Sequence, residues 1–306
     1  MDRIKTIMLG ICTYRRQELL SCCLASVDSL SVPNGYILKV VVVDNECSSK
    51  TQKIVKNAKL QNLYLEEPRR GISFVRNRII DAAIEHAADF IAFVDDDQIV
   101  PATWLENMIL SKEKMEADVV RGGVRYMHQN GSIVTEAFSK WQVCNESHST
   151  GTGGVLFSKW LISSNGLNLR FDHRFALSGG EDRFFFLNAY LKGAKIIRTP
   201  IAVVDEVLHG PRPGILSNFK RHFNQAWVDT MQDGELFGNR VAKEIFLKKY
   251  AGSFFKGILS LAIAPFVMPF SHSYGKKKLL KAARLTGRGL GATWGLCAKS
   301  LPQPYA

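Results

Sequence analysis

The stretch Phe90–Val100, which reads Phe-Ile-Ala-Phe-Val-Asp-Asp-Asp-Gln-Ile-Val, joins a short apolar run directly to three successive carboxylates. The run Phe90–Val94 has the length and composition of one strand buried in a parallel sheet. Like charges at the end of a strand repel one another, and burying any of them unpaired is costly. Asp95, Asp96 and Asp97 therefore need a positive partner. A divalent cation such as Mg²⁺ or Mn²⁺, shared with a phosphate, would supply it.

Alternation along an extended chain would separate the three carboxylates. Asp95 and Asp97 would then point to one side and Asp96 to the other. This favours an Asp-x-Asp site, with one carboxylate for a sugar or nucleotide and one for the metal. The alternative is a solvated acidic turn before a helix that begins at Pro101.

The segments before this stretch alternate between buried strands and amphipathic helices. The predicted strands are 5–12, 39–43, 62–65 and 90–94, and the predicted helices are 17–30, 51–58 and 72–87. Such alternation indicates an α/β fold with a mostly parallel sheet flanked by helices. Ligands bind these sheets beyond the carboxyl ends of the strands, where Thr13 and Arg15, Asp44 and Asp95–Asp97 would converge.

Two later stretches are candidates for the same crevice. Gly151–Gly154 precedes a strand at 155–157 and is either a flexible turn or a wall where backbone approaches a ligand closely. Glu181 and Asp182 open a helix that runs to about Leu191, where acids also complement the positive helix terminus. The pair is therefore either a simple cap or a means of aiming a carboxylate at a bound molecule.

Short closing strands are predicted at 194–197 and 202–204, and Asp205 and His209 follow them. Either residue could complete a metal shell, although a lone histidine is more often structural.

The net charge of +12 is concentrated at the C-terminal end. Residues 240–306 contain twelve Lys or Arg and a single acid, Glu244. We therefore predict a nearly neutral first domain at 1–239 and a basic, apolar helical extension at 240–306. The segment Lys276–Arg284 has the pattern of a basic amphipathic helix lying on an anionic membrane. A helical cap with a solvated basic face is the alternative.

Six cysteines without a Cys-x-x-Cys pair indicate free thiols in a reducing cytosol. Together with the basic tail, this predicts a cytoplasmic protein bound peripherally to the inner face of the cell membrane. A nucleic-acid-binding protein is disfavoured, because the positive charge lies beside an apolar run and is not interleaved with stacking aromatic residues.

Five motifs in this order resemble those of the family 2 inverting glycosyltransferases with the GT-A fold, over roughly residues 4–230. They are Gly10–Arg16, Val43–Asn45, Arg76–Asn77, Phe93–Asp97 and Gly179–Asp182. The chain is most similar to the bacterial exopolysaccharide subgroup typified by the succinoglycan glucosyltransferases. The resemblance implies a nucleotide-sugar donor, with UDP as the expected nucleotide, and a glycan or polyprenyl-linked acceptor.

The resemblance also implies roles for the donor-side residues. Thr13 and Arg15 lie where the family holds the nucleotide, and Asp44 lies where it contacts the base. Arg70 and Asn77 lie near the diphosphate and ribose.

The acidic residues receive their implied roles in the same way. Asp95, with Asp96 beside it, corresponds to the nucleotide-sugar side of the Asp-x-Asp motif, and Asp97 corresponds to its metal ligand. Asp182 corresponds to the catalytic base, with Glu181 as its neighbour. The subgroup tends to have a histidine just before a glutamate after the last strand, whereas this chain has Asp205 there and His209 further on.

Two other classes are weighed against this one. A metal-dependent sugar nucleotidyltransferase also places metal-binding aspartates in an α/β sheet, but no glycine-rich, lysine-bearing loop follows the first strand here. A non-catalytic basic protein that binds nucleic acid or membrane would explain the charge but not the acidic motifs.

Overall fold

The computed structural model describes residues 3–60, 62–128, 132–136, 145–208, 214–267, 269, 271–298 and 300–304. Contacts divide the chain into two compact units. The first, which we call the sheet unit, comprises residues 1–176 and 181–209. The second, the helical unit, comprises residues 177–180 and 210–306. Residues 210–239, which the sequence assigned to the first domain, therefore group with the C-terminal helices.

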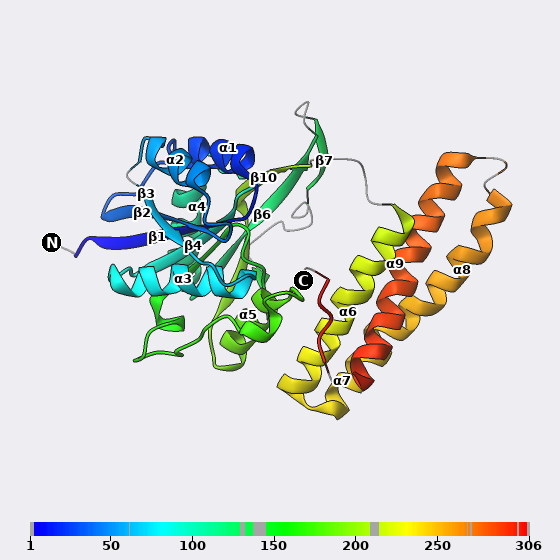
Figure 1. Cartoon of the computed structure of the whole chain (residues 1–306). Helices are drawn as coiled ribbons and strands as arrows, with labels where there is room; N and C mark the ends of the chain where they lie inside the picture. The colour runs from blue at the N-terminus through cyan, green and yellow to red at the C-terminus, as the bar shows by residue number, and fades with distance from the viewer. Residues whose placement is uncertain are drawn as a thin grey trace. The chain divides into compact units, whose positions relative to one another are not determined.

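The sheet unit is built on one ten-stranded sheet with the order β3-β2-β1-β4-β9-β6-β10-β5, to which β7 and β8 add at β6 and β10 (Figure 1). Its strands are β1 (Lys5–Thr13), β2 (Tyr36–Asp44), β3 (Asn62–Glu66), β4 (Phe90–Asp95), β5 (Gln98–Ile99), β6 (Val119–Met127), β7 (Ile133–Glu136), β8 (Asn145–Glu146), β9 (Val155–Ser158) and β10 (Ile196–Val207). Its α-helices are α1 (Gln17–Val27), α2 (Ser49–Asn57), α3 (Ile72–Glu85), α4 (Trp104–Met115) and α5 (Glu181–Leu191).

Strands β1 to β4 pair in parallel, as the alternation of strands and helices predicts. Strands β6 and β10 also pair in parallel. Between these two groups, β9 runs antiparallel to both β4 and β6. The glycine-rich segment Gly151–Gly154, which precedes β9, therefore lies at the edge of the sheet where β4 ends.

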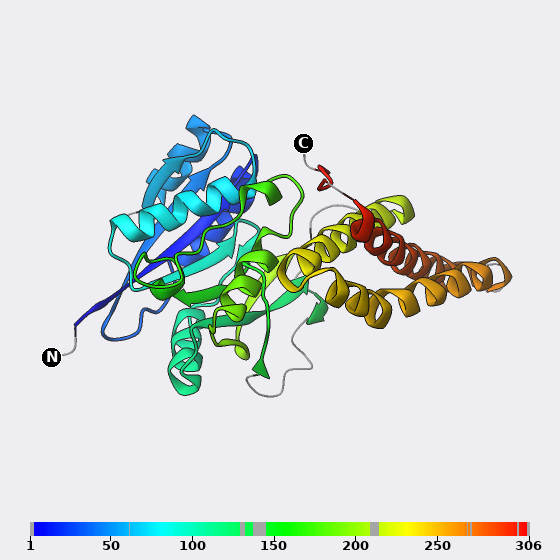
Figure 2. The ribbon, with the colours of Figure 1, turned by 90° about the horizontal axis from the view of Figure 1, so that it is seen from below.

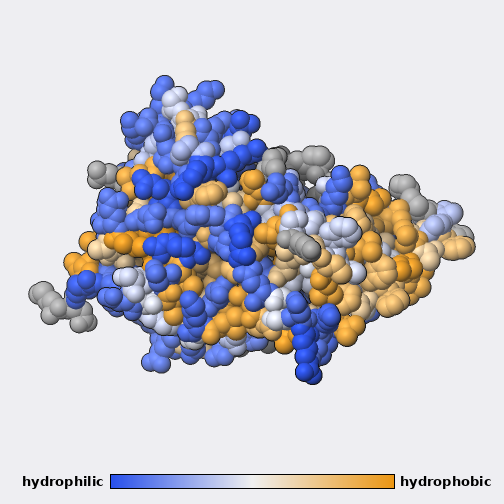
Figure 3. All heavy atoms as spheres, turned by 60° about the horizontal axis from the view of Figure 1, so that its bottom comes forward, coloured by the Kyte–Doolittle hydropathy of each residue, from blue (hydrophilic) through white to orange (hydrophobic). Residues whose placement is uncertain are grey.

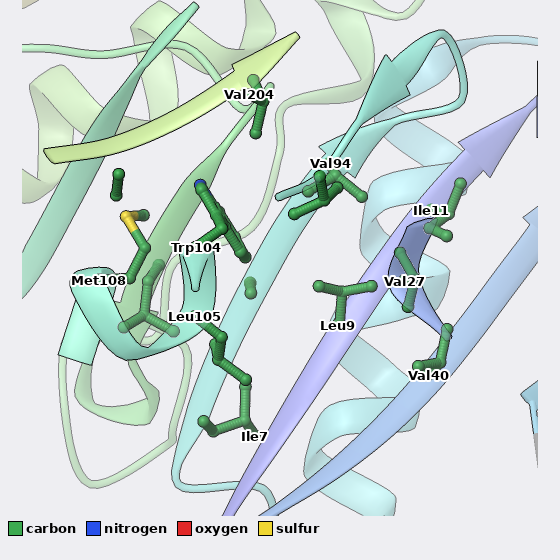
Figure 4. Close-up of a cluster of buried hydrophobic side chains, with 14 of the residues drawn as sticks. Ile7, Leu9, Ile11, Val27, Val40, Val94, Trp104, Leu105, Met108 and Val204 are labelled. Carbon is green, nitrogen blue, oxygen red and sulfur yellow. The ribbon is translucent and has the colours of Figure 1, made fainter. Parts of the chain in front are cut away.

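The sheet has a hydrophobic core on each face, so the sheet unit is a three-layer α/β/α structure. Leu9 on β1, Val27 on α1 and Trp104 on α4 are buried together on one face (Figure 4). Ile79 on α3 and Phe185 on α5 are buried on the other. Continuous apolar strands are expected where both faces of a parallel sheet are covered.

Three element predictions differ from the structure. The short strands predicted at 194–197 and 202–204 are one strand, β10, with a register shift between Arg198 and Val203. Asp205 therefore lies inside that strand. The helix predicted from Pro101 begins at Trp104.

The helical unit consists mainly of three long helices that pack as a bundle, with α9 between α6 and α8 (Figures 1 and 2). Its elements are α6 (Ile215–Phe237), α7 (Asn239–Phe246), a π-helical turn (Leu247–Ala251), α8 (Gly252–Val267) and α9 (His272–Cys297).

Glycines on one face of α9 explain its close packing on α6. A Cβ atom on Gly291 would lie 2.0 Å from the Phe223 carbonyl oxygen, and one on Gly295 would lie 2.6 Å from the Trp227 carbonyl oxygen. Only a residue without a side chain lets two helix backbones approach this closely.

Candidate active site

Polar side chains from neighbouring strands meet at one edge of the sheet, as the topology predicts. Thr13 is paired in register with Asp44 across β1 and β2, and Cys12 is paired with Asp95 across β1 and β4. Because these strands are parallel, their carboxyl ends lie side by side.

The three successive aspartates divide because β4 ends at Asp95 and the chain turns at the next two residues. Asp96 is buried, and it accepts hydrogen bonds from Thr13 Oγ1 at 2.8 Å and from Arg16 Nη1 at 3.1 Å. The same Arg16 nitrogen lies 3.0 Å from Asp97 Oδ2. The simple alternation of three side chains therefore fails, because it assumed that the strand continues.

Arg16 supplies part of the positive charge that the three carboxylates require, although the sequence motif that contains it did not assign it this role. Its guanidinium bridges Asp96 and Asp97 and remains half-exposed. Burial raises the pKa of Asp96 to about 6, although Arg16 and the Thr13 hydroxyl oppose the shift.

Asp95 is in a different environment from Asp96. Within the described residues, its carboxylate accepts no hydrogen bond and forms no ion pair. Burial raises its pKa; Arg76 and Arg121 oppose that rise, while the charges of Asp97 and Asp182 add to it. Asp182, which is far away in the chain, therefore lies near enough to Asp95 to act on its charge.

The glycine-rich segment Gly151–Gly154 lies against both clusters. A Cβ atom on Gly153 would lie 2.3 Å from Asp95 Oδ2, and one on Gly151 would lie 3.2 Å from Asp182 Oδ2. The backbone approaches the Asp95 carboxylate more closely than a side chain at Gly153 would allow, and a Cβ at Gly151 would be in tight contact with Asp182. That this segment forms a wall facing a ligand stays a prediction.

Glu181 and Asp182 have different surroundings at the start of α5. Glu181 is buried, and its Oε1 accepts a hydrogen bond from Nη1 of Arg76 on α3. Burial raises the pKa of Glu181 to about 7; Arg76 opposes the rise and Asp182 adds to it. Asp182 is half-buried, and its Oδ1 accepts the Arg183 backbone N–H at 2.7 Å. Asp182 is thus the member of the pair that is accessible to a bound molecule.

Arg121 on β6 is a candidate that sequence reasoning missed. Its Nη1 atom is buried and has no hydrogen-bond partner in the described part of the chain. Burial lowers the pKa of Arg121, and the carboxylates of Asp95 and Asp182 oppose that shift. An arginine among the apolar and glycine residues at the start of β6 was the available signal, because a buried guanidinium nitrogen ordinarily has a partner.

The nucleotide-side residues are placed at the ends of β1 and β2. Asp44 is fully buried, and its carboxylate accepts the backbone N–H groups of Glu46 and Ser48, each at 2.8 Å. Its charge therefore shapes the turn that follows β2. Arg15 has a φ of 57° and extends its guanidinium over the ring of Tyr14.

Two further residues from the donor side, Asn77 and Arg70, differ in exposure. Asn77 is buried, and its amide both donates to and accepts from the backbone of Phe171, at 2.8 and 2.9 Å. This pairing joins α3 to the segment before α5. Arg70 is exposed in the loop before α3.

The two described members of the predicted metal-ligand set, Asp97 and Asp205, belong to no metal-binding group of side chains. Asp205 accepts two hydrogen bonds from Arg125, at 2.6 and 2.8 Å, so both of its oxygens are engaged. His209 lies outside the described residues. Across the described ranges, no three His, Cys, Asp or Glu side chains form a group able to hold a metal ion.

The carboxylates of Asp95 and Asp97 nevertheless suit one metal ion, Mg²⁺. The Asp95 carboxylate accepts no hydrogen bond within the described residues, and the backbone of Gly153 lies close to it. Mg²⁺ is commonly bound by one or two carboxylates together with substrate phosphates, and needs no all-protein cage.

Comparison with known proteins agrees with this geometry. The family model "Glycosyl transferase family 2" matches residues 9–145. The succinoglycan biosynthesis protein ExoM of Rhizobium meliloti (strain 1021) is 30% identical over 233 residues, which cover 71% of this chain and 72% of ExoM. The chain belongs to glycosyltransferase family 2. This family 2 glycosyltransferase is also 27% identical to the glycosyltransferase AglE of Haloferax volcanii over 132 residues, 42% of each protein.

Solved structures show the same fold for this family 2 glycosyltransferase. The crystal structure of S. aureus TarS 1–349 in complex with UDP-GlcNAc superposes with a TM-score of 0.58 at 16% sequence identity. The match covers 94% of this chain and 91% of the TarS chain. The GT-A fold implied by the sequence resemblance is confirmed.

Proposed function

We propose that this glycosyltransferase moves a sugar from a nucleotide-diphosphate sugar, with UDP as the nucleotide, to a hydroxyl group of a glycan or polyprenyl-diphosphate-linked acceptor. The observation that carries the proposal is the position of Asp95 and Asp182 against one glycine-rich wall, Gly151–Gly154. The UDP-GlcNAc bound to TarS supports the donor class, and the name of ExoM supports a role in polysaccharide biosynthesis. A polyprenyl-linked acceptor would place the reaction at the cytoplasmic face of the cell membrane.

The donor would lie across the carboxyl ends of β1, β2 and β4. Asp44 holds the turn that would face the base, and Thr13 and Arg15 lie beside it at the end of β1. Arg121 is suited to an anionic oxygen of the donor, because its unpaired buried N–H group lacks an acceptor until a ligand arrives. Exposed Arg70 is a second cation for the diphosphate.

Asp97 and Asp95 are the residues that would hold a Mg²⁺ or Mn²⁺ ion with the donor diphosphate. A bound ion would neutralise charge that develops on the departing diphosphate. Asp205 is not included in this set, because Arg125 already occupies both of its carboxylate oxygens.

Asp182 would act as the general base. Its Oδ2 faces the wall of the crevice, and a carboxylate there can take the proton from an acceptor hydroxyl. The deprotonated oxygen would form a bond to the anomeric carbon as the bond to the diphosphate breaks on the opposite face, so the configuration would invert. Glu181 and Arg76 would position Asp182 by fixing the first turn of α5.

Replacing Asp182 by Asn tests this assignment. We expect transfer to fall by about 10²–10⁴-fold, the usual contribution of a general base. Binding of UDP-sugar, measured by calorimetry, should change little, because the substitution conserves shape. Asp81→Asn is the matched control, because Asp81 is an exposed acid on α3 at 3.9 Å from Arg170.

The anomeric configuration of the product, determined by nuclear magnetic resonance, tests inversion separately. Near-normal turnover in the Asp182→Asn protein would reject Asp182 as the base. A product that retains the donor configuration would reject the single-displacement mechanism.

A further inference from the structure

One side of α8 presents large apolar side chains to solvent. Phe255, Leu259 and Phe266 are 70%, 61% and 77% exposed. A broad apolar surface over the C-terminal helices is visible in the space-filling view (Figure 3). Isolated exposed apolar residues are ordinary, but a contiguous apolar surface usually marks an interaction site.

The spacing of these residues defines a continuous stripe on α8. Positions 255, 259, 262 and 266 are three or four residues apart, and all four are exposed. We call Phe255, Leu259, Ala262 and Phe266 the α8 stripe.

The opposite side of α8 is already occupied by α9. A Cβ atom on Gly257 would lie 2.8 Å from the Thr286 side chain, and Ser260 and Ala264 are buried. The internal packing of the bundle therefore leaves the α8 stripe without a partner among the described residues of the helical unit.

The charged side chains of α8 and of the turn before it are all lysines. Lys248, Lys249 and Lys256 are exposed next to it or just before it. From residue 245 to the end of the sequence there are ten Lys or Arg residues and no Asp or Glu. The stripe thus lies in a strongly basic part of the chain.

We infer that the α8 stripe inserts into the interface of an anionic lipid bilayer, with the neighbouring lysines contacting lipid headgroups. An apolar helix face flanked by lysine is typical of helices that lie in the plane of a membrane. No described helix combines the length and apolar character required to cross a bilayer, which agrees with a helix lying in the surface. Two copies of this face would bring lysines together, so self-association is disfavoured by like-charge repulsion.

The inference changes the location of the membrane contact predicted from sequence. The basic pattern at Lys276–Arg284 lies in α9, whose glycines are committed to packing on α6 and α8. The lysines of α9 would add attraction, whereas the apolar insertion would come from α8.

Vesicle flotation of the full-length protein tests the inference. The probes are vesicles of phosphatidylcholine alone and vesicles containing about one-third phosphatidylglycerol. We expect the protein to float with the anionic vesicles, and binding to weaken with added salt because surface charges are screened. Replacing Phe255, Leu259 and Phe266 together by Ser should weaken flotation by at least about tenfold.

Two matched variants control for folding and for charge. Ile84, Leu110 and Ile201 are exposed apolar residues of the sheet unit, and replacing them by Ser should leave flotation unchanged. Changing Lys248, Lys249 and Lys256 to Glu should reduce binding to anionic vesicles. The same change to Glu at Lys50, Lys53 and Lys56 on α2 should have little effect on that binding. Circular dichroism and thermal melting check that each variant is folded.

Each outcome bears on the inference. Equal flotation of the α8-stripe variant and the wild-type protein would overturn it. So would a change from dimer to monomer in that variant without a change in flotation, because the face would then cover a second copy. Retention on DNA in place of vesicles, lost in the Lys→Glu variant, would equally contradict a lipid partner. Failure of the proposed catalytic function would not affect any of these results.

Discussion

Two arginines of the sheet unit, Arg76 and Arg121, show how the same side chain can have opposite roles. Arg76 on α3 donates to Glu181, and both side chains are nearly inaccessible, at 9% and 5% exposed. Arg121 on β6 has a buried Nη1 atom without a partner in the described ranges. A paired buried charge stabilises the fold through its partner, whereas an unpaired one costs stability and is retained where a ligand completes it.

We therefore expect opposite effects when each arginine is replaced by methionine. Arg76→Met would leave Glu181 buried without a counter-ion and should lower the free energy of unfolding by about 3–5 kcal/mol. Arg121→Met should leave the melting temperature unchanged or higher, while the affinity for UDP-sugar falls by at least about tenfold. Thermal melting and calorimetric titration measure the two effects. Loss of stability in Arg121→Met, with normal donor binding, would show that Arg121 is structural.

At the scale of single elements, the segment Gly151–Gly154 is the feature that joins the two acidic clusters. It reaches this position because β9 runs antiparallel between β4 and β6. The atoms that a Cβ would meet at Gly153 are ends of the Asp95 and Gln98 side chains, so a substitution would displace these side chains and leave the backbone in place.

A series of glycine-to-alanine substitutions tests this role. Gly153→Ala should reduce transfer by at least about tenfold, because the new Cβ would lie 2.3 Å from Asp95 Oδ2 and force that carboxylate to move. Gly151→Ala should have a smaller effect, because its contact with Asp182 Oδ2 is longer, at 3.2 Å. Gly252→Ala, with nothing within 4 Å, is the control. Equal activity across the three proteins would argue against a wall that is close to both carboxylates.

At the scale of the whole molecule, acidic and basic groups are distributed unevenly between the two units. The sheet unit buries Asp95, Asp96 and Glu181, and burial raises the pKa of each. The helical unit carries the excess of positive charge. The raised pKa values of the buried acids affect stability, and the excess of positive charge affects the choice of partner.

The raised pKa values predict how stability depends on pH. Between about pH 5 and pH 7 the folded protein binds more protons than the unfolded chain, so the free energy of unfolding should fall as pH rises. The size of the effect is about 1 kcal/mol per unit of pKa shift. Hydrogen bonds from Arg69 lower the pKa of Glu67, so its contribution changes below this window.

Thermal melting at a series of pH values measures this dependence. Asp96→Asn and Glu181→Gln should each flatten the fall in melting temperature between pH 5 and pH 7, whereas Glu18→Gln, on the exposed side of α1, should not. If the stability of the wild-type protein rose across that range, and either substitution removed the rise, the predicted direction would be wrong.

The sequence by itself determined the fold class and the family. Apolar runs such as Phe90–Val94 specify strands buried on both faces, and the alternation with amphipathic helices specifies parallel crossovers, because both patterns depend on local spacing. The position of Thr13, Asp44 and Asp95 at one edge follows from that topology alone.

Only the tertiary structure decided which of the polar residues are available to a ligand. Asp96, Asn77 and Asp205 are engaged by Arg16, Phe171 and Arg125, respectively, and those partners are distant in the chain. Folding likewise decided that Nη1 of Arg121 has no hydrogen-bond partner among the described residues, and that one face of α8 is exposed. Hydrogen bonds, ion pairs and burial depend on contacts between segments that approach each other only after folding, and local periodicity carries no information about them.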